Sequence, residues 1–200
     1  AYIPIYLVNN KIANFVVASD INEGPIKVAQ CNIKKEMLEG KIECRVGSGL
    51  SVLKPCEVEC GIIAGMGGFL IIDILESGIQ VFKKMKYLIL QPMQHSDVLR
   101  KYIYEKGYRI IDESICISDG KYYETIKIKY DRINYNIDEI YYDISKMLVE
   151  KRDTVERNFI DYKIKKYENI LKSIKPKTYN SLKRQDELIM KVKKLKELNW

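Results

Sequence analysis

The chain has 200 residues, of which 46% are hydrophobic and 30% are charged. This length and balance are typical of one soluble globular domain, or of one domain with a small appendage. No apolar run approaches the length of a membrane span and no signal peptide opens the chain, so the sequence argues against a membrane protein and we expect a cytoplasmic location.

Structural metal sites and disulfide frameworks are also disfavoured. The single histidine is His95 and no C-x-x-C spacing occurs. The cysteines are scattered along the chain, at Cys31, Cys44, Cys56, Cys60 and Cys116. We therefore expect reduced thiols and no metal ion.

The net charge of +7 is unevenly distributed. Residues 131–200 carry 17 Lys and Arg against 12 Asp and Glu, a net charge of +5, whereas residues 1–130 carry 17 against 15, a net charge of +2. A basic excess of this kind suits a polyanionic partner such as nucleic acid. A biased genome that favours Lys, Ile, Tyr and Asn together would produce a similar excess, so charge alone leaves both explanations open.

The N-terminal part of the sequence predicts alternating helices and strands. Residues 2–8 indicate the tail of an amphipathic helix, and residues 15–20 indicate a buried strand that ends in Asp20. Residues 42–46 predict a short strand that Gly47-Ser48-Gly49 ends. Between these strands, Gly24-Pro25 opens a helix, and its apolar stripe is Ile26, Ala29, Ile33 and Met37.

The segment from Cys60 to Gly68 lies at the centre of the predicted domain. Its apolar run, residues 61–64, predicts a strand buried on both faces, and a helical pattern follows the glycines directly. Gly65, Gly67 and Gly68 remove side chains there, so a flat ligand could approach the backbone. A tight turn that needs glycine only for positive φ is the simpler explanation of these residues taken alone.

The next elements complete an α/β sheet. Residues 87–90 predict a buried strand closed by Gln91-Pro92, and residues 96–106 predict a helix capped by Gly107. Residues 108–117 and 122–130 predict a β-hairpin, because Asp-Gly between β-rich runs is a turn signal. We expect a mostly parallel sheet with an antiparallel edge, in a first domain of residues 1–130.

The pattern changes after Asp131. Apolar residues at helical spacing predict three helices, at about 137–148, 155–174 and 182–198, and Pro176 separates the second from the third. The near-3.5 spacing of the last two suggests an antiparallel helical hairpin, or a short coiled coil. We therefore expect a second, helical domain at residues 131–200.

Three strand ends are expected to meet at one edge of the parallel sheet: Asp20, the Gly65–Gly68 turn and Gln91-Pro92. An acid that ends the second strand of such a sheet commonly accepts hydrogen bonds from a nucleoside ribose, about 20 residues after a glycine-rich turn. Counting back that far from Asp20 runs off the start of the sequence. Either Asp20 is a helix N-cap, or the first strand and loop are missing here, which is the alternative that the sheet pattern favours.

Two common enzyme classes do not fit these motifs. A dinucleotide dehydrogenase would need the last glycine of its loop where Leu70 stands, and an acid where Gln91 stands. A serine hydrolase would need G-x-S-x-G, which the sequence lacks, and Gly47-Ser48-Gly49 is not a nucleophile elbow.

Six short motifs occur together in this sequence. They are AYIP at residues 1–4, SDINEGP at 19–25, RVGSGL at 45–50, IAGMGG at 63–68, LILQP at 88–92 and KYYE at 121–124. In this combination and order the chain resembles the bacterial TrmK family, the tRNA (adenine-22-N1)-methyltransferases. The resemblance covers most of residues 1–130, and the helical tail agrees in kind.

The resemblance implies a class I, Rossmann-like methyltransferase fold with a helical C-terminal domain, and S-adenosyl-L-methionine as the cofactor. Asp20 would hold the cofactor ribose and Ile21 would lie against its adenine. The implied cofactor-binding residues are Tyr2, Asp20, Ile21, Gly47, Ser48, Gly49, Ala64 and Gly65. The implied catalytic residues, between the methyl donor and the target base, are Gly65, Met66, Gly67, Gln91 and Pro92.

The sequence departs from the family pattern in two places. The family's cofactor loop, an Asp-x-Gly segment that ends in Asp-His just before the position of Ala1, is not in this sequence. Ser48 stands where the family usually has Asp.

The resemblance also implies tRNA as the partner of a monomeric enzyme that methylates N1 of adenine 22. The residues that would grip the tRNA backbone are Lys183, Arg184, Lys191, Lys193, Lys194 and Lys196, although each fits an ordinary solvated helix face equally well. Met66 or a nearby aromatic could pack on the target base, or Met66 could belong to the core. His95 is expected in a surface loop rather than in contact with substrate. A non-catalytic nucleic-acid-binding or scaffold protein on the same fold is the alternative function.

Overall fold

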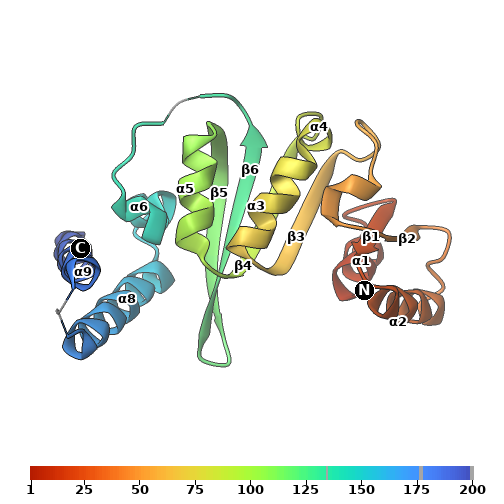
Figure 1. Ribbon diagram of the computed structural model, residues 1–200. Coiled ribbons are helices and arrows are strands. Elements are labelled where there is room, and N and C mark those ends of the chain that lie inside the picture. Colours follow the sequence, from red (N-terminus) through yellow and green to blue (C-terminus); the bar gives the residue numbers. More distant parts are fainter. Residues whose placement is uncertain (134, 176–177, 199–200) are drawn as a thin grey trace. The chain divides into compact units, whose positions relative to one another are not determined.

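The computed structural model describes residues 1–133, 135–175 and 178–198 (Figure 1). The chain forms two compact units. Unit 1 contains Ala1–Glu59 and Asp73–Met85, and unit 2 contains Cys60–Ile72 and Lys86–Trp200.

Unit 1 is built on a pair of parallel strands with helices around them. Its elements are α1 (Tyr2–Asn9), β1 (Val16–Asp20), α2 (Glu23–Lys35), β2 (Ile42–Val46), the 3-10 helix η1 (Gly49–Val52) and α4 (Ile79–Phe82), and the second half of α3 (Gly68–Ser77) also belongs to it. The two predicted strands and the Gly24-Pro25 helix start are therefore confirmed. The prediction that residues 15–20 are buried was wrong, because β1 is only partly buried and Phe15 before it is 52% exposed.

The core of unit 1 follows the predicted apolar stripe of α2. Ile26, Ala29 and Ile33 are buried, and Ile33 packs with α1 and β2 residues such as Val8 and Ile42. The prediction was wrong for Met37, which is exposed. Met37 follows the end of α2 and has a φ of +55°, so the helical periodicity no longer applies to it.

Unit 2 contains a four-stranded sheet in the order β3-β4-β6-β5 (Figure 1). Its strands are β3 (Cys60–Gly67), β4 (Tyr87–Gln94), β5 (Tyr108–Ser118) and β6 (Lys121–Tyr130). β3 and β4 are parallel, whereas β6 is antiparallel to both β4 and β5. The α/β class with an antiparallel edge is confirmed, and so is the hairpin, whose Asp119 and Gly120 have the positive φ angles that a two-residue turn requires.

Two details of strands β3 and β4 differ from the prediction. Both strands continue past the residues predicted to end them: β3 runs through Gly65 to Gly67, and β4 runs through Pro92 to Gln94. The run Gly61–Ala64 is also not buried on both faces, because Ile63 is buried whereas Ile62 is exposed. Within the described residues β3 is an edge strand, which leaves its side chains less covered than those of a central strand.

The helices of unit 2 begin with α5 (Ser96–Glu105), which packs against the sheet (Figure 1). The helix predicted at about 137–148 is instead two short helices, α6 (Ile140–Asp143) and α7 (Lys146–Glu150). The chain is extended at Ile144, and the Ser145 side chain accepts a hydrogen bond from Leu148 N at 3.1 Å, which caps α7.

The last two helices are α8 (Thr154–Ser173) and α9 (Tyr179–Glu197), a helical hairpin as predicted. The predicted break at Pro176 lies outside the described residues. Asp153 caps α8, and a capping box of Thr178 and Ser181 starts α9. Their shared core also includes the side chain of Tyr122 from β6, so the hairpin packs against the sheet of unit 2.

A buried polar network connects α5, the sheet and the following helices. Arg100 of α5 is 2% exposed, and it pairs with Glu113 of β5 at 2.8 Å and with Glu124 of β6 at 2.6 Å. The Ser145 hydroxyl donates to Glu113 at 2.6 Å, and the Ser145 backbone N–H donates to Glu156 of α8 at 2.9 Å.

One of these carboxyls has an unusual proton affinity. Burial raises the pKa of Glu156 from 4.5 to about 7, although the positive charge of Arg100 opposes this rise. The negative charges of Glu124 and Glu113 raise the pKa further. One guanidinium therefore pairs with two carboxyl groups, and Glu156 is a third acid nearby, which keeps its proton until near neutral pH.

We expect this proton to make folding stability depend on pH. The folded-state pKa of Glu156 lies above its unfolded value, so the native state binds the extra proton, and this stabilisation is present below pH 4.5 and lost as the pH rises through about 7. Glu156→Gln removes the titration and keeps the acceptor for Ser145 N. The substitution should change the free energy of unfolding by roughly 2–3 kcal/mol more favourably at pH 8 than at pH 4.5. Urea unfolding at the two pH values measures this difference.

Glu105→Gln on the exposed face of α5 is the matched control. It should change the free energy of unfolding by a similar small amount at both pH values. A Glu156→Gln protein whose stability followed the wild-type pH curve would contradict the assignment.

Candidate active site

In unit 1, Asp20 ends β1 where the chain turns into α2. Its Oδ1 accepts a hydrogen bond from the N–H of Asn22 at 2.9 Å, and Asn22 is the N-cap residue of α2. The carbonyl of Asp20 accepts from Gly47 N at 2.9 Å, which joins the end of β1 to the end of β2. The next side chain, Ile21, is 67% exposed. Asp20 therefore supports the turn with one carboxylate oxygen, beside an exposed apolar side chain.

The Gly47–Gly49 loop is held by close packing within unit 1. A Cβ on Gly47 would lie 2.5 Å from Val52 Cγ1, and a Cβ on Gly49 would lie 2.5 Å from Ile74 Cγ2, so side chains are excluded at both positions. Ser48 between them is exposed. Both glycines are thus required by the fold itself, whatever else the loop binds.

Arg45 holds the other side of this loop. Its guanidinium donates to the carbonyl of Val52 at 2.8 Å and pairs with Glu57 at 2.6 Å and with Glu43 at 2.8 Å. The hydrogen bond from Arg45, followed by the one from the N–H of Lys54, lowers the pKa of Glu57 to about 2. The chain is therefore fixed on both sides of η1.

Tyr2 lies in the first turn of α1, and its side chain is 87% exposed. It lines a shallow hollow together with residues of α1 and with Asn32 and Lys35 of α2. Its contact with the cofactor stays a prediction.

In unit 2, the glycine segment forms a β-bulge rather than a simple turn. The register of β3 against β4 shifts between Ala64 and Met66, so Gly65, with a φ of +79°, is left out of the ladder. Its N–H donates instead to Oε1 of Gln91 at 3.0 Å. Apart from its chain neighbours, no residue has an atom within 4 Å of where a Cβ of Gly65 would be, so the bulge faces open space. The hydrogen bond confirms the prediction that the glycine segment and Gln91 lie together.

The start of α3, which follows β3 directly, and the residue that follows β4 approach each other closely. A Cβ on Gly68 would lie 2.2 Å from the carbonyl oxygen of His95, which no real side chain tolerates. His95 is held in the left-handed region, with a φ of +58°, as the N-cap residue of α5. Gly67 likewise faces the side chain of Gln94. Gly68 is therefore needed because two backbones meet there.

The predicted catalytic residues differ in exposure. Gly65 is exposed, Met66 and Gln91 are partly buried, and Pro92 is buried. The amide nitrogen of Gln91 donates to the carbonyl of Pro92 at 3.2 Å and to Met93 Sδ at 3.6 Å. Gln91 thus holds the bulge and the end of β4 together.

Two exposed side chains at this edge were missed by sequence reasoning. Phe69 is 56% exposed and Met93 is 55% exposed. The ring of Phe69 lies 4.9 Å from that of His95, at an interplanar angle of 55°. A large apolar residue directly after a glycine pair was the available signal, but Phe69 also continues the apolar run of α3 and so resembled a core residue.

No acid–base pair is found among the residues around this bulge, and the described part of the chain contains no group of three or more His, Cys, Asp or Glu placed to hold a metal ion. None of the described helices is long and apolar enough to cross a bilayer. What the site offers is open backbone, a fixed amide and exposed apolar side chains, which suit the positioning of a flat ligand.

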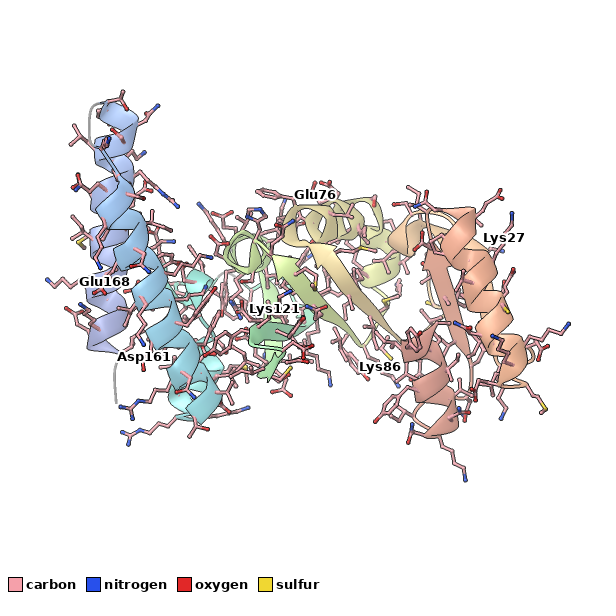
Figure 2. All side chains as sticks on the ribbon, turned by 90° about the horizontal axis from the view of Figure 1, so that it is seen from below. Lys27, Glu76, Lys86, Lys121, Asp161 and Glu168 are labelled. Atoms are coloured by element: carbon pink, nitrogen blue, oxygen red, sulfur yellow. The ribbon has the colours of Figure 1, made fainter. Side chains whose placement is uncertain are left out.

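Several predicted RNA-binding side chains of α9 have partners within unit 2. Lys191 pairs with the buried Asp143 at 2.5 Å and Lys194 pairs with Asp138 at 2.6 Å. Lys196 pairs with Glu168 of α8 at 2.7 Å, and Glu168 is labelled in Figure 2.

Arg184 pairs with Glu187 of its own helix at 3.9 Å. For Lys183 and Lys193 the described residues show no ion pair. A further basic surface lies on α8, where Lys165 and Lys166 line a shallow hollow beside Tyr162.

Comparison with known proteins identifies the family. A family model described as TrmK, tRNA (adenine(22)-N(1))-methyltransferase, matches residues 1–197. A tRNA (adenine(22)-N(1))-methyltransferase of Bacillus subtilis (strain 168) is 41% identical over 126 residues, which is 63% of this chain and 53% of that protein, so the match spans about half of the relative's length.

Solved structures agree with the family match. The B. subtilis m1A22 tRNA methyltransferase TrmK has a TM-score of 0.88 and 31% identity, over 100% of this chain and 88% of that one. M. capricolum TrmK in complex with S-adenosyl-homocysteine has a TM-score of 0.84 and 25% identity, over 100% and 88%. The chain belongs to the TrmK family.

Proposed function

We propose that this protein transfers a methyl group from S-adenosyl-L-methionine to N1 of adenine 22 in tRNA. The observation that carries the proposal is the bulge at Gly65, which presents open backbone at the end of β3 while Gln91 fixes its N–H. Family membership supplies the reaction class, and the M. capricolum relative was solved with the product of this cofactor.

The residues at the end of β1 suit the nucleoside part of the cofactor. One oxygen of Asp20 accepts from Asn22 N, and its carboxylate has a second oxygen that can accept from a ribose hydroxyl. Ile21 offers an exposed apolar side chain to a flat base. We assign the backbone of Gly47–Gly49, with Ser48, to the edge of the cofactor adenine. Tyr2 and Ala64 remain predicted cofactor contacts.

The chemistry requires positioning rather than a strong base. S-adenosyl-L-methionine, when bound, supplies an electrophilic methyl group on a sulfonium. The neutral adenine carries a lone pair on N1, so the N1–C bond forms as the C–S bond breaks, with no proton to remove first. Gly65, Met66, Gly67, Gln91 and Pro92 would hold the reactants in line, an effect that can contribute several orders of magnitude in rate.

The helical segment, residues 131–200, would grip the tRNA as a separate functional domain, with residues 1–130 as the methyltransferase domain. Its net charge is +5 and its two long helices carry most of the lysines. N1 lies on the pairing edge of adenine, so the nucleotide must leave any stack or pair before it reacts. We expect the protein to act as a monomer, in the cytoplasm where tRNA is matured.

The role of Asp20 can be tested by titration calorimetry with S-adenosyl-L-methionine. Asp20→Asn keeps an oxygen for Asn22 N but loses the charge that strengthens a bond to ribose. We expect cofactor affinity to fall roughly 10- to 100-fold, because hydrogen bonds to charged groups contribute about 1.5–3 kcal/mol. Methyl transfer to unmodified tRNA at a subsaturating cofactor concentration should fall by the same factor.

Glu23→Gln, an exposed acid three residues further along, is the matched control and should bind as the wild type does. Unchanged affinity in Asp20→Asn would remove Asp20 from the cofactor site. If the wild-type protein bound tRNA but gave no heat with cofactor and no methyl transfer, the non-catalytic binding protein would be the better assignment.

Lys191, Lys194 and Lys196 of α9 form ion pairs with acids of unit 2, whereas the described residues give no ion pair for Lys183 and Lys193. We expect the unpaired lysines to contribute more to tRNA binding. In a double variant, both Lys183 and Lys193 are replaced with Gln. The plot of log affinity against log salt should then become less steep, by up to about 0.9 for each phosphate that the protein no longer neutralises. Lys194→Gln should change the slope less, because Lys194 is paired with Asp138. Filter binding from 50 to 200 mM salt measures these slopes.

Lys27→Gln on α2 of unit 1 is the control for the removal of a surface lysine, and it should leave the slope unchanged. Equal slopes in all four proteins would place the phosphate-binding residues elsewhere in the chain.

A further inference from the structure

We propose that the ring of Phe69 is the surface on which the target adenine stacks, and that His95 holds this ring in place from behind. The inference deepens the proposed function and rests on it. It assigns a base-contacting residue, Phe69, and a positioning residue, His95, outside the motifs that the sequence singled out.

Phe69 lies at the edge of the sheet where β3 ends. It follows Gly67 and Gly68 directly, at the start of α3, and so stands at the carboxyl end of β3 where parallel sheets bind ligands. More than half of the side chain is exposed. The exposed ring is therefore available to a flat neutral ligand at this edge.

The backbone next to Phe69 is fixed by its close approach to His95. Gly68 lies against the His95 carbonyl so closely that no Cβ fits between them, and the Phe69 and His95 rings are 4.9 Å apart. His95 adopts a left-handed φ of +58° at this close approach. The fold therefore places the ring of Phe69 beside that of His95.

Exposed and polar groups of β4 stand beside the end of β3. Met93, also more than half exposed, follows Gln91 on β4 and receives a hydrogen bond from the Gln91 amide nitrogen at its sulfur. The oxygen of the same amide accepts from Gly65 N in the bulge. Gln91 thus connects the open backbone at Gly65 to an exposed thioether, which is a polarisable group suited to an aromatic base.

An adenine is the occupant that these features favour. A base taken out of its stack is held in enzymes by aromatic and apolar side chains, and the stacking contributes about 1–3 kcal/mol per base. The ring, the thioether and the bulge that faces open space all lie on the adjacent strands β3 and β4 and the loops that follow them, within unit 2. The bulge is the element to which the reaction is assigned.

The experiment compares methyl transfer to unmodified tRNA by the wild type, Phe69→Leu, Phe69→Tyr and Phe15→Ala. Leucine keeps an apolar side chain and removes the aromatic face, so we expect kcat/KM for tRNA to fall roughly 10- to 100-fold with unchanged cofactor affinity. Phe69→Tyr should restore nearly full activity. Phe15 is 52% exposed and lies in unit 1, so Phe15→Ala is the matched control and should behave as the wild type does.

A second readout reports the base itself. A tRNA with 2-aminopurine at the target position should fluoresce more brightly in complex with Phe69→Leu than with the wild type, because stacking on an aromatic ring quenches the flipped base. Thermal unfolding of each variant shows whether the fold is intact. Wild-type turnover and fluorescence in Phe69→Leu would overturn the inference and leave the proposed function standing.

The role of His95 is tested by a double-mutant cycle. His95→Asn tolerates the left-handed backbone and removes the ring. It should lower kcat/KM when Phe69 is present and have little further effect in the Phe69→Leu background, because it acts through Phe69. Additive effects would overturn the positioning role of His95. Absence of cofactor binding and of turnover in the wild type would instead refute the proposed function, and the inference with it.

Discussion

The buried guanidinium of Arg100 sets how the parts of unit 2 are joined. It pairs with Glu113 on β5 and Glu124 on β6, and Glu113 continues the network to Ser145 at the start of α7. A buried charge costs several kcal/mol unless partners surround it, so few arrangements of these elements satisfy all of these groups together. Burial of apolar surface is non-directional and would not by itself select this arrangement. The network thus determines where the helical segment starts on the sheet.

The same network reaches the candidate active site. Ser96 opens α5 and donates to Glu124 at 2.6 Å, so the first turn of this helix is attached to the buried carboxylate that Arg100 holds. His95 is the residue immediately before it, and its carbonyl meets Gly68. Loops at the ends of parallel strands are usually the mobile part of an α/β site. Here the segment that follows β4 is fixed on two sides. Ser96 bonds to the buried Glu124, and the carbonyl of His95 contacts Gly68 at the start of α3.

The parts of the fold that local sequence specifies were predictable. The hairpin at Asp119-Gly120, strand β2 and the two long helices all follow from turn residues, periodicity and caps within a few positions. The helix predicted at 137–148 failed because Ser145 bonds to Glu113, 32 residues earlier, and periodicity cannot show such a partner. The continuation of β3 through its glycines likewise depends on pairing with β4, which the sequence of either strand alone does not reveal.

The site was predictable where glycine marks a backbone requirement and unpredictable where a side chain's partner decides its role. Gly65 and Gln91 were placed together correctly, but the amide of Gln91 is engaged by Gly65, Pro92 and Met93, which makes it a support for the bulge. Lysine spacing on α9 could not show that Lys191 faces the buried Asp143 of another helix. Gly65 and Gly68 stand where a positive φ or a close backbone approach requires glycine, which a sequence can show. The roles of Gln91 and Lys191 depend on partners that are distant in the sequence, which local patterns cannot show.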